Sequence, residues 1–220
     1  MPYGRERYHG RERYAPVRQG RPPSTSPWPR SLLVPGLLAL GAGLLLAGCA
    51  ASRPSGNARV PEPAKSVDLN RYLGRWYEIA RYENRFERDC EGVTAEYTLR
   101  SDGLIGVLNT CREHTPGGRA RSSEGRAKIV AGSNNAKLRV SFFGPFFFGD
   151  YWVLDHADDY AWAIVGEPSG KYLWILHREA TPSPAALNDL VRRAGALGYD
   201  TSLLRMTRQP PGQGGVQAGG

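Results

Sequence analysis

The chain has few of the residue types that most often perform catalysis or hold metals. Its 220 residues include three cysteines, four histidines and two methionines. The histidines are scattered and lack the short spacings that metal ligands share; they are His9, His114, His156 and His177. No G-x-S-x-G nucleophile motif, glycine-rich phosphate loop or C-x-x-C pair is present. We therefore expect no catalytic residues, no metal and no cofactor.

The formal net charge of +8 is concentrated at one end of the chain. Residues 1–48 hold seven Arg and only two Glu, a surplus of five that leaves +3 for the rest. A folded domain with so small a surplus has an ordinary, mildly basic surface. The composition therefore gives no reason to expect a nucleic-acid partner.

Residues 31–47 form the longest apolar run. The run is uncharged, follows Arg30, and is short and interrupted by Gly and Pro. These features are typical of a secretory signal peptide rather than a membrane-spanning helix. The run ends in Leu46-Ala47-Gly48-Cys49, which resembles the lipobox of bacterial lipoproteins. The resemblance implies cleavage before Cys49, diacylglyceryl attachment to its thiol and acylation of the new amino terminus. The alternative is an uncleaved anchor in which the cysteine is incidental.

The regions around this signal have different expected roles. Ala50 follows the cysteine in place of Asp, and this resembles lipoproteins that are sorted to the outer membrane and face the periplasm. Acyl chains at Cys49 would hold the protein durably at that membrane. Residues 1–48 are predicted to be an n-region and lipoprotein signal peptide, of which 1–30 are disordered or lie upstream of the true start. Residues 49–65 are predicted to be the lipidated cysteine and a flexible tether, 66–208 the folded domain, and 209–220 a disordered tail.

The domain shows repeated alternation of apolar and polar side chains. In residues 93–100, one face is Val, Ala, Tyr and Leu, and the other is Thr, Glu, Thr and Arg. This period of two is typical of half-buried strands. It predicts eight strands, at 76–83, 91–100, 104–112, 124–131, 136–143, 150–155, 160–166 and 171–178.

A helix follows the strands. Ser183 suits the N-cap and Pro184 the first helical position, and Gly198 suits the end of the helix. A last short strand can follow within 199–206. Eight consecutive antiparallel strands predict an all-β fold, an up-and-down β-barrel with the C-terminal α-helix packed on it. A sandwich is the alternative.

Three separated motifs resemble those of the lipocalin family. Gly74-Arg75-Trp76 lies at the start of the first predicted strand, Asp159-Tyr160 lies between the sixth and seventh, and Arg178 ends the eighth. The similarity extends over about 67–206 and indicates a bacterial lipocalin of the outer-membrane lipoprotein type. In lipocalins the Arg packs over the Trp ring at the closed end of the barrel. The resemblance thus implies structural roles for Gly74, Trp76, Asp159, Tyr160 and Arg178.

Two cysteines remain if Cys49 is lipidated. An exported protein with an even number of cysteines favours a disulfide, here between Cys90 and Cys111. A hairpin turning at 102–103 brings both near the same end of the barrel, although a two-residue turn does not place them in register. Free buried thiols are the alternative.

Alternation also predicts which side chains face the interior. If Trp76 points inward, so do Glu78 and Tyr82, and Leu99 is among the inward residues of its strand. Glu78 is then expected to form an internal hydrogen bond or to have a raised pKa. The remaining predicted ligand-binding residues are Val93, Ala95, Tyr97, Ala127, Ile129, Leu138, Val140, Phe142, Phe146, Tyr172 and Trp174.

The lipocalin resemblance implies a binding protein for a small hydrophobic ligand. We expect a fatty acid, a lysophospholipid or a similar amphiphile, carried for storage, transport or repair of envelope lipids. A filled core without a cavity is the alternative from the pattern alone. Other functional alternatives are an enzyme that acts on a lipophilic substrate through Glu78 or Cys90, and a haem or pigment binder. A homodimer is left open.

The segment SFFGPFFFG, residues 141–149, places five phenylalanines in one connection. Counting the connections places this segment at the open end of the barrel, opposite Trp76 and Arg178. Four of the rings are predicted to form an apolar lip that contacts an acyl chain or a bilayer; they are Phe143, Phe146, Phe147 and Phe148. Packing against another loop or a second protomer is the alternative.

Overall fold

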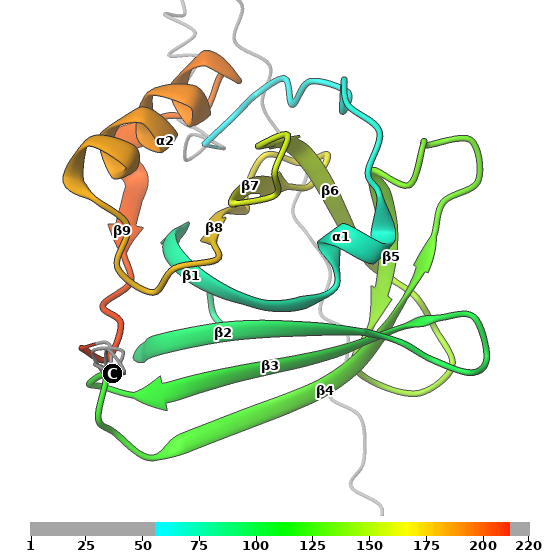
Figure 1. Ribbon diagram of the computed structural model, residues 1–220, viewed down its shortest axis with the longest axis horizontal. Coiled ribbons are helices and arrows are strands. Elements are labelled where there is room, and N and C mark those ends of the chain that lie inside the picture. The colour runs from blue at the N-terminus through cyan, green and yellow to red at the C-terminus, as the bar shows by residue number, and fades with distance from the viewer. Residues whose placement is uncertain (1–55, 212–220) are drawn as a thin grey trace, which may run out of the picture. The chain divides into compact units, whose positions relative to one another are not determined.

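The computed structural model describes residues 56–211 (Figure 1). Each strand pairs antiparallel with the next, and β1 pairs with both β2 and β8, so the sheet closes into a barrel. The strands are β1 (Gly74–Tyr82), β2 (Cys90–Leu99), β3 (Ile105–Glu113), β4 (Ala120–Ile129), β5 (Lys137–Ser141), β6 (Gly149–His156), β7 (Trp162–Gly166) and β8 (Leu173–His177). The predicted eight-stranded up-and-down barrel is confirmed. The predicted signal peptide and Cys49 lie outside the described residues.

Four further elements complete the domain. They are α1 (Leu69–Tyr72), α2 (Pro184–Ala196), a 3₁₀ helix (Thr201–Leu203) and β9 (Leu204–Met206). Strand β9 pairs with the second half of β1, beyond the point where β2 leaves that edge. Figure 1 shows α2 and β9 together on one side of the barrel. Within the described range, no helix is long and apolar enough to cross a membrane.

Helix α2 begins and ends as its sequence predicts. The Ser183 hydroxyl accepts the N–H of Ala186 at 3.2 Å, and Pro184 occupies the first turn. The helix ends before Gly198, whose φ of +92° lies in the region that favours glycine. Leu190 and Ala194 are fully buried against the outer face of the barrel. Burying a leucine contributes about 1.5–3 kcal/mol, so this apolar face holds the helix on the barrel.

A bulge in β1 changes which of its side chains point into the barrel and which point towards α2. Glu78 pairs with Leu176, but Ala80 rather than Ile79 pairs with Ile175, so one residue of β1 is extra. The alternation therefore reverses after Glu78. Arg81 lies opposite the cavity-lining Trp174, whereas Ala80 and Tyr82 belong to the apolar cluster under α2. The prediction that Tyr82 points into the barrel is thus wrong.

One end of the barrel is closed by α1. The Asp68 carboxylate caps this short helix by accepting the N–H groups of Asn70 and Arg71. Below it, the Arg178 guanidinium lies 3.7 Å from the centroid of the buried Trp76 ring. Arg178 also donates to the carbonyls of Arg71, Leu73 and Arg75 at 2.7–2.9 Å. The single cation thus joins the last strand to the chain segment that enters the first.

Residues 56–65 run along the barrel rather than forming part of a free tether. The Asn57 side chain is buried and donates to Leu197 O at 3.0 Å, and its backbone N–H donates to Gly170 O at 3.1 Å. The carbonyl of Gly56 accepts the N–H of Asp200 at 2.8 Å. Figure 1 shows this segment, in cyan, passing from beside α2 to α1. Its backbone and amide hydrogen bonds fix it, so the predicted tether of 49–65 is wrong for 56–65.

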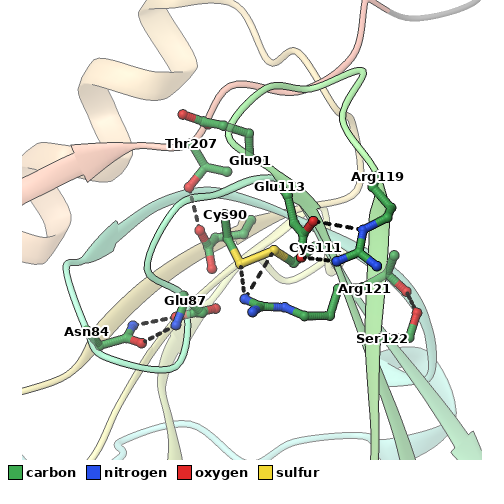
Figure 2. The surroundings of a disulfide bond; sticks show 12 residues. Asn84, Glu87, Cys90, Glu91, Cys111, Glu113, Arg119, Arg121, Ser122 and Thr207 are labelled. Atoms are coloured by element: carbon green, nitrogen blue, oxygen red, sulfur yellow. Dashed lines mark hydrogen bonds and ion pairs between the residues drawn. A yellow bond between two sulfur atoms is a disulfide. The ribbon is translucent and has the colours of Figure 1, made fainter.

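A disulfide joins Cys90 at the start of β2 to Cys111 in β3, with 5.3 Å between their Cα atoms (Figure 2). Cys90 lies opposite Glu113, and a register shift between Glu91 and Thr94 adjusts the ladder. The bulge supplies the offset that a tight hairpin turn alone does not give. The predicted disulfide is confirmed.

Candidate functional site

The barrel contains a cavity of about 660 Å³. This volume is within the range of small-molecule sites, which are mostly apolar and lined by a few polar groups. Ten of the predicted ligand-binding residues line it: Glu78, Val93, Ala95, Tyr97, Ala127, Leu138, Val140, Phe142, Tyr172 and Trp174. The alternating pattern therefore located most of the cavity wall.

Three predicted lining residues lie elsewhere. Tyr82 packs edge-on against Tyr199 under α2, because of the β1 bulge. Ile129 is the last residue of β4 and stays 36% exposed, since β3 begins at Ile105, opposite Ala127, and does not extend beside it. Phe146 is 61% exposed, stacks on Phe148 and does not itself line the cavity.

Leu99, also expected inside, is 63% exposed at the end of β2. Both Leu99 and Ile129 are strand ends. Alternation alone does not show where the neighbouring strands stop covering a side chain.

Three tyrosines form a hydrogen-bonded group at the closed end of the cavity. The Tyr151 hydroxyl lies 2.8 Å from that of Tyr72 and 2.9 Å from that of Tyr97. Burial raises the pKa of Tyr97 to about 12 and that of the other two tyrosines further. All three hydroxyls therefore stay neutral and satisfy one another in an otherwise apolar floor. Tyr151 could have been found from its alternation with Val153 in β6, but nothing in the sequence placed Tyr72 here.

A buried ion pair backs the cavity wall, where Glu78 is a lining residue and Arg81 is not. Arg81, with no exposed surface, donates to the Glu78 carboxylate at 2.7 Å, to Thr207 Oγ1 at 3.0 Å, and to two backbone carbonyls. Burial, together with the nearby Glu87 carboxylate, raises the pKa of Glu78 to about 8, and the opposing effects of Arg81 and Thr207 are smaller. Glu78 thus has an internal partner, as expected. That the partner is Arg81 could not be predicted, because the β1 bulge is what turns Arg81 to the same side.

The connection between β1 and β2 covers one side of the open end. Glu87 in this connection accepts from Trp174 Nε1 at 3.0 Å, and Figure 2 shows Asn84 beside it. Phe86 stacks on Tyr172, which stacks on Trp174, with centroid distances of 5.4 and 5.7 Å. These contacts place an aromatic surface and one carboxylate beside the mouth of the cavity.

The rest of the mouth comes from connections at the same end of the barrel. Phe143 and Phe148 of the β5–β6 connection and Glu167 of the β7–β8 connection line the cavity. Arg121 of β4 also lines it, and its guanidinium lies 3.3 Å from the Cys90 sulfur (Figure 2). The open end thus combines exposed aromatic rings with a few charged groups.

The geometry favours binding over the chemical alternatives. Cys90 is bonded to Cys111, so the hypothesis of a Cys90 nucleophile is wrong. No histidine lines the cavity, and the described residues contain no group of three or more side chains suited to a metal ion. Glu78 is occupied by Arg81 and Thr207. What remains is an apolar chamber with neutral hydroxyls at its floor.

Comparison with known proteins identifies a matching family model and several relatives. Residues 67–209 match the family model of the lipocalin-like domain. The chain is 39% identical to the outer membrane lipoprotein Blc of Escherichia coli strain K12 over 179 residues, which are 81% of this chain and 98% of the relative. It is 39% identical to the protein of the same name from Vibrio cholerae, over 76% of this chain and 94% of the relative. It is 42% identical to temperature-induced lipocalin-1 of Arabidopsis thaliana, over 67% of this chain and 82% of the relative.

Solved structures share the fold at low sequence identity. Insecticyanin from the tobacco hornworm Manduca sexta superposes with a TM-score of 0.56 and 22% identity, covering 70% of this chain and 88% of that one. The cockroach allergen Per a 4 superposes with a TM-score of 0.54 and 17% identity, covering 70% and 96%. These two structures support the barrel topology.

Proposed function

The chain belongs to the lipocalin family, and from this premise we propose that it binds and carries a fatty acid, lysophospholipid or similar amphiphile in its barrel. The single observation that carries the proposal is the cavity of about 660 Å³ with its apolar wall. Burying an acyl chain there contributes about 0.8 kcal/mol for each methylene removed from water. We propose storage, transport or repair of envelope lipids as the role of this binding.

The lining suggests how an amphiphile is oriented. Ala127, Leu138 and Val140 lie on adjacent strands and offer only apolar surface to a ligand. The charged groups Glu87 and Arg121 lie towards the open end. An acyl chain therefore enters tail first, with its polar head near the mouth.

We also propose that the protein is anchored to the outer membrane through acyl chains on Cys49 and faces the periplasm. Support comes from the lipobox-like Leu46-Ala47-Gly48-Cys49 and from two relatives whose names describe outer membrane lipoproteins. Globomycin treatment of expressing cells tests the anchor, since it blocks the lipoprotein signal peptidase. Accumulation of the precursor supports the anchor, and processing that continues unchanged contradicts it.

A cavity-filling substitution tests the ligand site. Ala95 lines the cavity from β2, so Ala95→Phe adds an aromatic ring to the space an acyl chain needs. Displacement of a fluorescent fatty acid should show at least a tenfold weaker Kd. Ala120→Phe is the matched control, because Ala120 is exposed at the start of β4 and does not line the cavity. Equal affinity in the two variants would contradict the site, and no uptake by the native protein would contradict the function.

A further inference from the structure

The β5–β6 connection, residues 142–148, exposes an unusual amount of aromatic surface. Phe143, Phe146 and Phe148 are 88%, 61% and 79% exposed. The rings of Phe146 and Phe148 stack with centroids 5.5 Å apart, so they form a continuous surface. Contiguous exposed apolar surface of this kind marks an interaction site more often than scattered single residues do.

Two cations lie beside the same connection. The Phe147 ring lies 4.9 Å from the Lys128 ammonium and 5.5 Å from the Arg126 guanidinium. Arg126 also donates to Gly144 O at 2.9 Å, which fixes the connection against the outer face of β4. Lys128 is exposed, and within residues 56–211 its ammonium has no hydrogen bond or ion pair. The connection is thus held in one shape with a free positive charge beside it.

Other exposed cations lie at the same end of the barrel. Because consecutive strands are antiparallel, the β1–β2, β5–β6 and β7–β8 connections share one end. Arg85 and Arg88 lie in the first of these and Lys171 in the last, and all three are exposed. Of the acidic residues in these connections, Glu87 and Glu167 are engaged by Trp174 and by the turn around Ser169, and Glu83 pairs with Arg205, while Asp89 is exposed.

The first described residues lie at this end too. Asn57 is hydrogen-bonded to Gly170 in the β7–β8 connection. Only six residues separate Gly56 from Cys49. A chain advances at most about 3.3–3.6 Å per residue, so the open end lies within roughly 25 Å of a membrane that holds Cys49. This point rests on the proposed lipidation, whereas the aromatic and cationic surface does not.

We propose that the open end docks on the surface of an anionic phospholipid bilayer, with residues 143–148 entering the interfacial region and the surrounding cations contacting lipid phosphates. Aromatic rings and basic residues together suit the boundary between headgroups and acyl chains. A second copy of the chain fits less well, since a twofold contact through this surface would bring one basic surface against another. Docked this way, the cavity mouth opens onto the lipid, and an amphiphile moves between bilayer and barrel without crossing water.

Vesicle binding without the anchor tests the docking. All the described strands, the helices and the disulfide lie between Gly56 and Pro211, so a chain that begins at Cys49 keeps every contact that forms the barrel. This chain with Cys49→Ser carries no acyl group. It should co-sediment with vesicles of phosphatidylcholine and phosphatidylglycerol, more weakly with phosphatidylcholine alone, and less as salt is added.

Substitutions identify the surface. Replacing Phe143, Phe146 and Phe148 with Ser should weaken binding to the anionic vesicles at least tenfold, and Lys128→Gln should weaken it about fivefold. Leu99→Ser is the matched control: Leu99 is an exposed apolar side chain at the opposite, α1 end of the barrel, and its loss should leave binding unchanged. Near-ultraviolet circular dichroism confirms that each variant is folded.

Two results would overturn the docking: no binding of the Cys49→Ser chain to anionic vesicles, or equal losses in the triple variant and in Leu99→Ser. A chain that takes up fatty acid but ignores vesicles refutes the docking alone. A chain that binds vesicles but takes up no fatty acid or lysophospholipid refutes the proposed function and leaves the docking standing.

Discussion

Replacing Arg81 with Met tests the buried polar wall that the β1 bulge creates. The substitution keeps an unbranched apolar side chain but removes the donors to Glu78, Thr207 and the carbonyls of Glu87 and Cys90. Removing one partner of a buried ion pair costs about 3–5 kcal/mol, because the other charge is left unpaired. We expect a loss of this size in the free energy of unfolding, measured by urea denaturation at pH 9.

The loss should depend on pH in a direction fixed by Glu78. Its pKa in the folded protein, about 8, lies above its ordinary value of 4.5. The stability contributed by this carboxyl is therefore fully present below about 4.5 and is lost as the pH rises through about 8. Without Arg81 the pKa rises further, so at pH 5 the carboxyl remains neutral and little charge is left unpaired. We expect Arg81→Met to be less destabilising at pH 5 than at pH 9.

Two further variants complete this test. Glu78→Gln/Arg81→Met should remove most of the pH dependence, since no titrating group remains in the pair. Arg192→Met is the control for losing a surface ion pair: the Arg192 side chain is 72% exposed beside Asp189, and such pairs contribute about 0–1 kcal/mol. A loss in Arg81→Met no larger than in the control, or equal losses at pH 5 and pH 9, would refute the reasoning.

Two other predictions concern the covalent and cationic links of the barrel. Replacing Cys90 and Cys111 with Ser should lower the free energy of unfolding by about 3 kcal/mol, because the bond closes a loop with a sequence separation of 21; urea denaturation that is unchanged by reduction of the native protein would contradict this. Arg178→Met should cost about 2–4 kcal/mol, since it removes the contact with Trp76 and the donors to four backbone carbonyls. A loss as small as in Arg192→Met would show that the closed end does not depend on this cation.

The alternating pattern predicts the barrel, and local residue chemistry predicts α2. Val93, Ala95 and Tyr97 show a period of two with no interruption, and all three line the cavity. The start of α2 could be predicted because its signals are local. The N-cap Ser183, the following Pro184 and the apolar face of the helix depend on residues only a few positions apart in the sequence.

The predictions that were wrong concern residues whose positions depend on contacts between distant parts of the sequence. The extra residue in β1 reverses the side of Tyr82 and brings Arg81 inside, and only the pairing with β8 reveals it. Residues 56–65 look like a linker because they contain prolines and polar residues, yet Asn57 finds its partners at Gly170 and Leu197, more than 100 residues away. Tyr72 joins the floor of the cavity through its hydrogen bond to Tyr151 of β6, which is 79 residues away in the sequence.

Native mass spectrometry of the protein purified from membranes tests the central claim most directly. The account predicts one amphiphile with an acyl chain bound per barrel, retained by the native chain and by Ala120→Phe and depleted in Ala95→Phe. A native barrel that carries no acyl ligand and takes up none when fatty acid or lysophospholipid is added would contradict it.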